Sequence, residues 1–216
     1  MSTGAGVGST EPGRSGGAGF AGAGAGISYE MIAIGASWGG LQAVSTLLFG
    51  LSADVDAAIV VAQHRGPTSS GGGLEALLQR HAGRPVSEPH DKDTIERGHV
   101  YLAPADYHLL VEDGHFALSI DSRVQYARPS IDVLFESVAE AYRERAIGIV
   151  LTGANEDGAA GLAAIKERGG VAVVQDPATA ERRTMPDAAL AATGADAVLP
   201  LAEIPNFLYG LCCGAS

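Results

Sequence analysis

The feature that most constrains the fold is a series of short apolar segments that do not alternate with polar residues. The clearest of these segments are 31–34, 57–62, 147–152 and 171–174. Strands that are buried on both faces have this pattern, which is typical of a parallel sheet covered by helices on each side. Because crossovers between parallel strands are right-handed, we expect an α/β fold with a doubly wound, mostly parallel, Rossmann-like sheet in three layers.

Longer segments with helical spacing of apolar residues separate these strands. We expect helices over 41–48, 74–81, 131–142, 159–168, a stretch after Pro186, and 202–211. The middle of the chain differs, because a strand at 99–104 precedes two short apolar runs joined by an Asp-Gly turn. These runs, 108–111 and 115–118, predict a small antiparallel hairpin. A last short strand is expected at 197–200.

The N-terminal segment has a different composition from the rest of the 216 residues. Ten of the 30 glycines lie within residues 1–26, where Phe20 is the one large apolar side chain after Met1. Such a segment cannot bury enough apolar surface to offset its chain entropy. We therefore expect a flexible Gly/Ala-rich tail over residues 1–27 and one folded domain over residues 28–216.

Charge and composition exclude several classes of function. The chain has 14 basic and 25 acidic side chains, for a formal charge of −11, whereas nucleic-acid binding normally needs a basic face. No apolar run approaches the roughly 20 residues that cross a bilayer, so membrane insertion is not expected. The two cysteines, Cys212 and Cys213, are adjacent and cannot form a disulfide framework, which fits a reducing, cytoplasmic location.

Three polar residues, Ser37, His64 and Asp157, each follow an expected strand directly or within one loop. Ligands and reactive groups of such sheets gather at the carboxyl ends of the strands. Ser37 also lies at the centre of a G-x-S-x-G pattern between a strand and a helix, where glycines permit the sharp turn that exposes a nucleophile. Free N–H groups at the start of that helix, such as that of Trp38, are suited to binding an oxyanion.

The other two residues have the chemistry that a serine nucleophile needs. A histidine such as His64 can take the hydroxyl proton, and a carboxylate such as Asp157 can orient the imidazole. The order Ser, His, Asp differs from that of α/β-hydrolases, Ser, Asp, His, and no histidine follows Asp157. Each residue also has a simpler interpretation: Ser37 as a helix N-cap, His64 as a structural histidine, and Asp157 as the N-cap of the helix that follows it.

Several separated motifs together resemble one family, the catalytic domain of the chemotaxis protein-glutamate methylesterases of the CheB type. The similarity extends from about residue 30 to residue 208. The motifs are Gly35-Ala36-Ser37-x-Gly39-Gly40, Gln63-His64, the segment 128–135, Leu151-Thr152-Gly153 through Asp157-Gly158-Ala159, Gln175-Asp176-Pro177, and Met185-Pro186.

The resemblance implies hydrolysis of γ-glutamyl methyl esters on the cytoplasmic helices of methyl-accepting chemoreceptors, giving glutamate and methanol, and also allows glutamine deamidation. It implies that Ser37 is the nucleophile, His64 the general base and Asp157 its orienting carboxylate. Backbone N–H groups of Trp38 and Ala154 would bind the oxyanion. No metal or organic cofactor is implied. Family members usually carry a receiver domain that regulates the esterase. For this chain we expect either that a separate receiver protein regulates the activity in trans or that the activity is unregulated.

The sequence also departs from the family pattern, and three alternatives stay open. Trp38 stands where a threonine is usual, and residues 154–156 differ from the usual loop. These changes allow an esterase for a non-receptor substrate, or a binding module of the same fold without catalysis. A nucleotide-binding module is the third alternative, although the G-x-G-x-x-G spacing is absent because Ser37 occupies the place of its second glycine.

Overall fold

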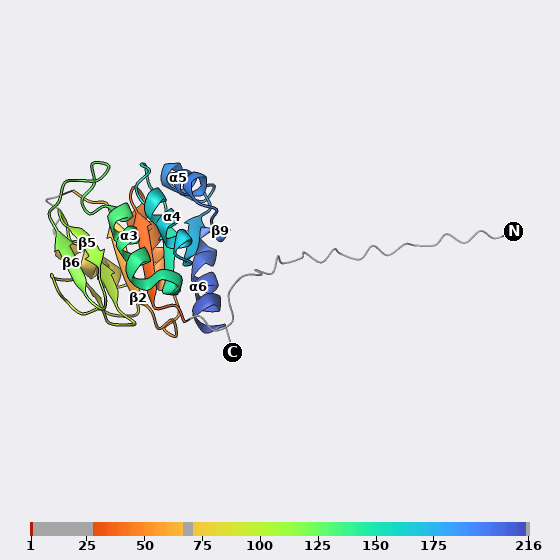
Figure 1. The fold of residues 1–216 in the computed structure, drawn as a ribbon. Helices are drawn as coiled ribbons and strands as arrows, with labels where there is room; N and C mark the ends of the chain where they lie inside the picture. The colour runs from red at the N-terminus through yellow and green to blue at the C-terminus, as the bar shows by residue number, and fades with distance from the viewer. Residues whose placement is uncertain (2–27, 67–70, 215–216) are drawn as a thin grey trace.

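The structure is a computed structural model that describes Met1, residues 28–66 and residues 71–214 (Figure 1). The expected tail at 1–27 therefore lies, apart from Met1 at its start, outside the described residues. Among the residues described, no helix has the length and apolar character needed to span a membrane.

A seven-stranded sheet forms the centre of the molecule, and every pair of neighbouring strands in it is parallel. The strand order is β3-β4-β2-β1-β7-β8-β9. The strands are β1 (Met31–Ala36), β2 (Ala58–Gln63), β3 (Val86–Ser87), β4 (Val100–Leu102), β7 (Ala146–Val150), β8 (Val171–Gln175) and β9 (Ala197–Leu199). The predicted fold class is confirmed, and the two-residue strand β3 is the one member of the sheet that the sequence pattern did not indicate.

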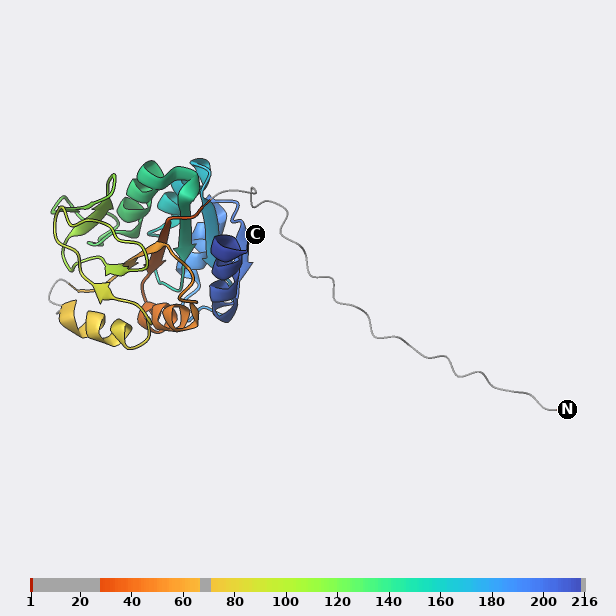
Figure 2. The same cartoon turned by 90° about the horizontal axis from the view of Figure 1, so that it is seen from below.

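Helices cover both faces of this sheet (Figure 2). One face carries α1 (Gly40–Gly50), α2 (Gly71–Gln79) and α6 (Ile204–Cys213). The other carries α3 (Ile131–Tyr142), α4 (Ala159–Glu167), α5 (Thr184–Ala192) and the antiparallel hairpin of β5 (His108–Val111) and β6 (Phe116–Ser119). Short 3-10 turns, Arg143–Arg145 and Leu201–Glu203, precede β7 and α6.

The central strand β1 shows why its segment is apolar without alternation. Ile32 and Ile34 pack into the core beneath α1 and α6, whereas Met31 and Ala33 pack into the core beneath α3 and α4. All four are fully buried. Both faces of the strand are therefore covered, as expected for the middle of a doubly wound sheet.

Three helices begin two or more residues away from the expected positions, and one of them is α2, which starts at Gly71 rather than at residue 74. α5 starts at Thr184, two residues before Pro186, because proline is tolerated in the first turn, where its missing N–H has no intrahelical acceptor. The segment expected as one helix from residue 202 is a 3-10 turn followed by α6, which has Pro205 at its second position.

The strand order reverses at β1, which lies between β2 and β7. Connections on opposite faces diverge there, and a crevice opens at the carboxyl ends of the strands. Backbone hydrogen bonds continue the sheet past its last formal pairs, from the Ser37 N–H to the Thr152 carbonyl (3.0 Å) and from the His64 N–H to the Ala36 carbonyl (3.0 Å). The loops after β1, β2 and β7 therefore begin from a rigid common edge.

Candidate active site

The three residues that the sequence singled out form one hydrogen-bonded row. Ser37 Oγ lies 3.2 Å from His64 Nδ1, and His64 Nε2 lies 2.7 Å from Asp157 Oδ2. A carboxylate only accepts hydrogen bonds, so Nε2 carries the proton in this arrangement and Nδ1 faces the Ser37 hydroxyl as an acceptor. The imidazole is thus in the tautomer that can take the proton of Ser37.

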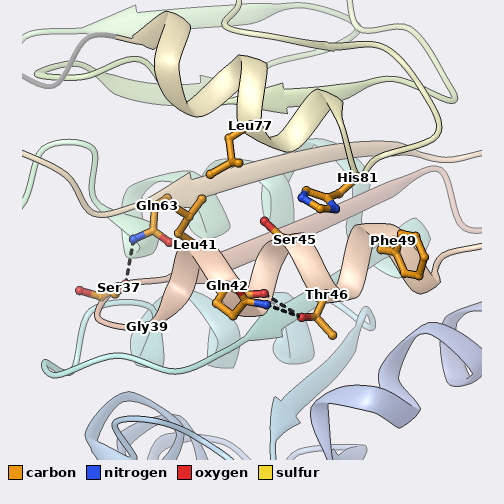
Figure 3. Close-up of a pocket in the computed structure, with 10 residues that line it drawn as sticks. All are labelled: Ser37, Gly39, Leu41, Gln42, Ser45, Thr46, Phe49, Gln63, Leu77 and His81. Atoms are coloured by element: carbon orange, nitrogen blue, oxygen red, sulfur yellow. Dashed lines mark hydrogen bonds between the residues drawn. The ribbon is translucent and has the colours of Figure 1, made fainter.

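The turn after β1 places Ser37 at the start of α1 without making it a capping residue. The N-cap of α1 is Gly39, whose φ of 74° is the left-handed conformation that glycine adopts readily, and no side chain in the described part of the chain caps this helix end. The simpler interpretation of Ser37 as an N-cap is therefore wrong. Gln63 fixes the turn, because its Nε2 donates to the carbonyls of Ser37 (2.8 Å) and His64 (3.0 Å), as Figure 3 shows for Ser37.

Asp157 is fully buried and receives hydrogen bonds from another helix. The N–H groups of Ile131 and Asp132 donate to its two oxygens at 2.7 and 2.9 Å, and Ser130 Oγ donates at 2.9 Å. Asp157 therefore satisfies the N-terminus of α3, whereas the expected capping of its own helix, α4, is not seen. The loop after β7 carries the side chain across to the neighbouring helix.

The start of α4 is satisfied by Asp132 instead. Its Oδ1 accepts the N–H groups of Gly158 (2.9 Å) and Gly161 (2.8 Å), and its Oδ2 accepts from Gln125 (3.1 Å). Asp132, in the first turn of α3, thus caps α4, and Asp157, just before α4, caps α3. This exchange holds Asp157 in place behind His64.

The two carboxyl groups titrate in opposite directions. Burial raises the pKa of Asp157, but the hydrogen bonds from His64, Asp132 and Ile131 outweigh it, so this pKa lies below its ordinary value. Burial, together with the charge of Asp157, raises the pKa of Asp132 to about 6 in spite of the two N–H donors. Asp157 is therefore the member of the pair that stays ionised beside His64.

The raised pKa of Asp132 predicts a pH dependence of stability. A carboxyl group whose pKa is higher in the folded state stabilises that state below its unfolded pKa, and this contribution disappears as the pH rises through about 6. Asn at position 132 keeps one oxygen for Gly158 and Gly161 but does not ionise. We expect Asp132→Asn to gain stability relative to the wild type, by roughly 1–3 kcal/mol, between pH 4 and pH 7.

Urea unfolding of both proteins at pH 4, 5, 6 and 7 measures this difference. The absolute stabilities also depend on other carboxylates, so the difference between the two proteins is the informative quantity. A constant difference over this range would contradict the assigned titration.

Trp38 forms the rim of the site. Its side chain is 57% exposed, its Nε1 donates to Glu181 Oε1 at 2.8 Å, and the Arg182 guanidinium lies 5.3 Å from its ring centre. The Thr152 hydroxyl donates to the Trp38 carbonyl at 3.0 Å and also bonds to the backbone of Arg182. These contacts connect the Ser37 turn to the segment before α5, a link that sequence spacing did not indicate.

The backbone N–H groups proposed for an oxyanion are free of protein acceptors. Within the part of the chain that the structure describes, neither the Trp38 N–H nor the Ala154 N–H donates a hydrogen bond to another group. Asn155, which the sequence did not single out for chemistry, lies beside the imidazole, with Nδ2 3.4 Å from His64 Nδ1. An amide beside the unprotonated nitrogen can help to fix the ring.

Two hollows adjoin the row. The larger, of about 640 Å³, begins at Ser37 and follows α1 toward Phe49, with Leu77 and His81 on its other wall (Figure 3). The smaller, of about 260 Å³, lies on the side of His64 that carries Asn155. The Ser37–His64 pair therefore lies between an elongated, partly apolar groove, which Ser37 lines, and a compact hollow, which His64 and three arginines line.

A parallel α/β sheet with a Ser-His-Asp row at its topological switch point defines a chain of the serine-hydrolase type. The family model described as CheB methylesterase matches residues 32–208. This chain belongs to that family.

Individual proteins agree with this assignment. A protein from Leptospira interrogans with the name "Putative protein-glutamate methylesterase/protein-glutamine glutaminase" is 48% identical, over 86% of this chain and 96% of its own length. A protein-glutamate methylesterase/protein-glutamine glutaminase from Rhodospirillum rubrum is 38% identical over 83% of this chain, but this match covers 48% of that protein. The crystal structure of the Thermotoga maritima CheB methylesterase catalytic domain matches with a TM-score of 0.80 and 31% identity, over 86% of this chain and all of that one.

Proposed function

We propose that this chain is a protein-glutamate methylesterase that hydrolyses γ-glutamyl methyl esters to glutamate and methanol. The observation that carries the proposal is the row Ser37–His64–Asp157, with distances of 3.2 and 2.7 Å, in a chain of the CheB methylesterase family. The relatives' names support the same substrate class and add glutamine deamidation as a second reaction.

In the proposed mechanism, Ser37 Oγ attacks the ester carbonyl while His64 Nδ1 takes its proton. The N–H groups of Trp38 and Ala154 bind the oxyanion of the tetrahedral intermediate. The His64 imidazolium then gives its proton to the methoxy oxygen as the bond between this oxygen and the carbonyl carbon breaks, so that methanol leaves and an acyl-enzyme remains on Ser37. Water, deprotonated by His64, hydrolyses that ester and releases the glutamate carboxylate. Asp157 keeps the ring oriented and stabilises the imidazolium in both steps.

We propose methylated glutamates on the cytoplasmic helices of chemoreceptors as the natural substrate. The family assignment supports this choice, and so does the elongated groove of about 640 Å³ beside Ser37, which offers room for residues next to the esterified side chain. We further propose residues 28–216 as the catalytic unit, because the match to the Thermotoga catalytic domain covers the whole of that domain.

The test measures methanol released from chemoreceptor membranes that carry methyl-labelled glutamates. We expect the purified chain to release methanol from them, and to release ammonia more slowly from receptors with glutamine at the same positions, because an amide is the less reactive acyl donor. Free glutamate γ-methyl ester serves as the comparison substrate. Hydrolysis of the free ester without any release from receptors would contradict the receptor assignment and favour a non-receptor ester.

A further inference from the structure

The polar groups that lack partners in the core are concentrated around the triad. Among the described residues, the buried side-chain nitrogen and oxygen atoms without a hydrogen bond are Gln63 Oε1, Asn155 Oδ1, and Arg65 Nε and Nη1. Gln63 and Arg65 flank His64 in the sequence, and Asn155 bonds to its ring. Buried polar groups are normally paired, so unpaired ones gathered at one place indicate a site that takes a ligand group.

Arg65 has the largest unused capacity of the three. Its side chain is 7% exposed, and only Nη2 is engaged, with Glu88 Oε1 at 2.5 Å and the Ala103 carbonyl at 2.6 Å. A guanidinium has five N–H donors in a planar fork, and leaving a charged group buried without acceptors is costly. Nη2 thus holds the side chain in place, whereas Nε and Nη1 have no acceptor among the described residues.

Arg65 lines the smaller hollow beside His64, together with Arg123 and Arg128. The latter two share one carboxylate, since each donates to Asp106 Oδ1 at 2.9 Å. The lining of the hollow contains these three guanidinium groups and no carboxylate, whereas the carboxylates of Glu88, Asp106 and Asp157 pair with lining residues without being part of the lining. A hollow lined by three arginines next to the triad is unexpected in a chain whose formal charge is −11.

We propose that this hollow is a carboxylate subsite: it binds an acidic side chain of the substrate that lies beside the esterified glutamate. The proposal rests on the proposed esterase function and adds a sequence preference to it. A carboxylate fits because its two oxygens match the planar fork of a guanidinium and would supply the acceptors that Arg65 lacks. It would also offset the repulsion between an acidic substrate and this acidic chain.

The test compares three short peptides with one glutamate γ-methyl ester flanked on both sides by glutamate, glutamine or arginine. We expect kcat/KM for the glutamate-flanked peptide to exceed that for the glutamine-flanked one at least about tenfold, in the range of a charge-assisted hydrogen bond. The arginine-flanked peptide should be the poorest. If the net charge of the chain governed selection instead, the arginine-flanked peptide would be the best substrate.

Two variants locate the preference. Arg65→Lys keeps a positive charge that can pair with Glu88, but a lysine has one ammonium group and lacks the further N–H donors of a guanidinium. Arg123→Gln removes one positive charge from the exposed rim of the hollow. Each should reduce the ratio between the glutamate- and glutamine-flanked peptides several-fold. The matched control is Arg97→Gln, which removes an ion-paired arginine outside the hollow and should leave the ratio unchanged. Equal ratios in all four proteins would overturn the proposal.

A failure of the esterase itself is distinguishable from a failure of the subsite. If no peptide releases methanol, binding of the glutamate- and glutamine-flanked peptides to the Ser37→Ala protein, followed by calorimetry, still reports on the hollow. Tighter binding of the acidic peptide that Arg65→Lys weakens would support the subsite alone. Methanol release that depends on Ser37 but shows no preference among flanking residues would support the esterase and reject the subsite.

Discussion

Replacement of Ser37 by alanine is expected to lower the kcat of methyl-ester hydrolysis by at least about 10⁴-fold. The variant lacks the attacking oxygen, so no acyl-enzyme forms, and only the oxyanion donors and the bound geometry remain to act on water. Among the described residues the hydroxyl bonds only to His64, and the Ser37 backbone keeps its bond to the Thr152 carbonyl. The melting temperature should therefore stay within about 2 °C of that of the wild type.

The measurement pairs a methanol-release assay with thermal unfolding on the same preparations. Ser119→Ala is the matched control, because Ser119 lies on β6, bonds to Asp121 and lines neither of the two hollows beside the triad. It should keep most of the activity. Retention of more than a tenth of the wild-type rate by Ser37→Ala would show that another group or a bound water performs the attack.

Replacement of Asp157 by asparagine is expected to reduce turnover by about 10⁴-fold and also to destabilise the fold. The activity falls because the amide can donate to His64 Nε2, which leaves the proton on Nδ1, where it faces Ser37. Stability falls because both oxygens of Asp157 accept hydrogen bonds, from Ile131, Asp132 and Ser130 as well as from His64. An amide group placed against these donors costs about 1–3 kcal/mol for each one left unpaired.

The two effects are separated by measuring kcat and the urea midpoint on one preparation. Asp176→Asn is the control, since Asp176 follows the neighbouring strand β8 and bonds to the backbone of its own turn, with no contact to His64. A variant at position 157 with normal turnover would show that the orientation of His64 does not depend on this carboxylate. Normal stability would show that the cap on α3 is dispensable.

The fold could be predicted from the sequence because its local patterns agree with the tertiary structure. The apolar segments of β1, β2, β7 and β8 are buried on both faces, and this burial is why they lack alternation. The short strand β3, with two residues, contains too few positions to show a pattern. The start of α5 differs from the prediction because a proline breaks a helix in its interior but is tolerated in its first turn, where Pro186 lies.

The site was predictable to the extent that its chemistry lies at strand ends. Ser37, His64 and Asp157 follow β1, β2 and β7, whose carboxyl ends meet in the sheet. The supporting contacts were not predictable, because they join segments far apart in the chain. The alternative interpretation of Asp157 as the cap of its own helix is wrong, because Asp157 caps α3, and Trp38 bonds to Glu181 across 143 positions.

Covalent labelling with a fluorophosphonate, followed by peptide mass spectrometry, tests the assignment of Ser37 most directly. The reagent phosphonylates a serine only when a neighbouring base activates it. We expect one adduct, on the peptide that contains Ser37, and no adduct in His64→Ala. The loss of methanol release should be proportional to the fraction of the protein that is labelled. An unlabelled Ser37 in a protein that still releases methanol, or full activity after complete labelling, would contradict the proposed nucleophile.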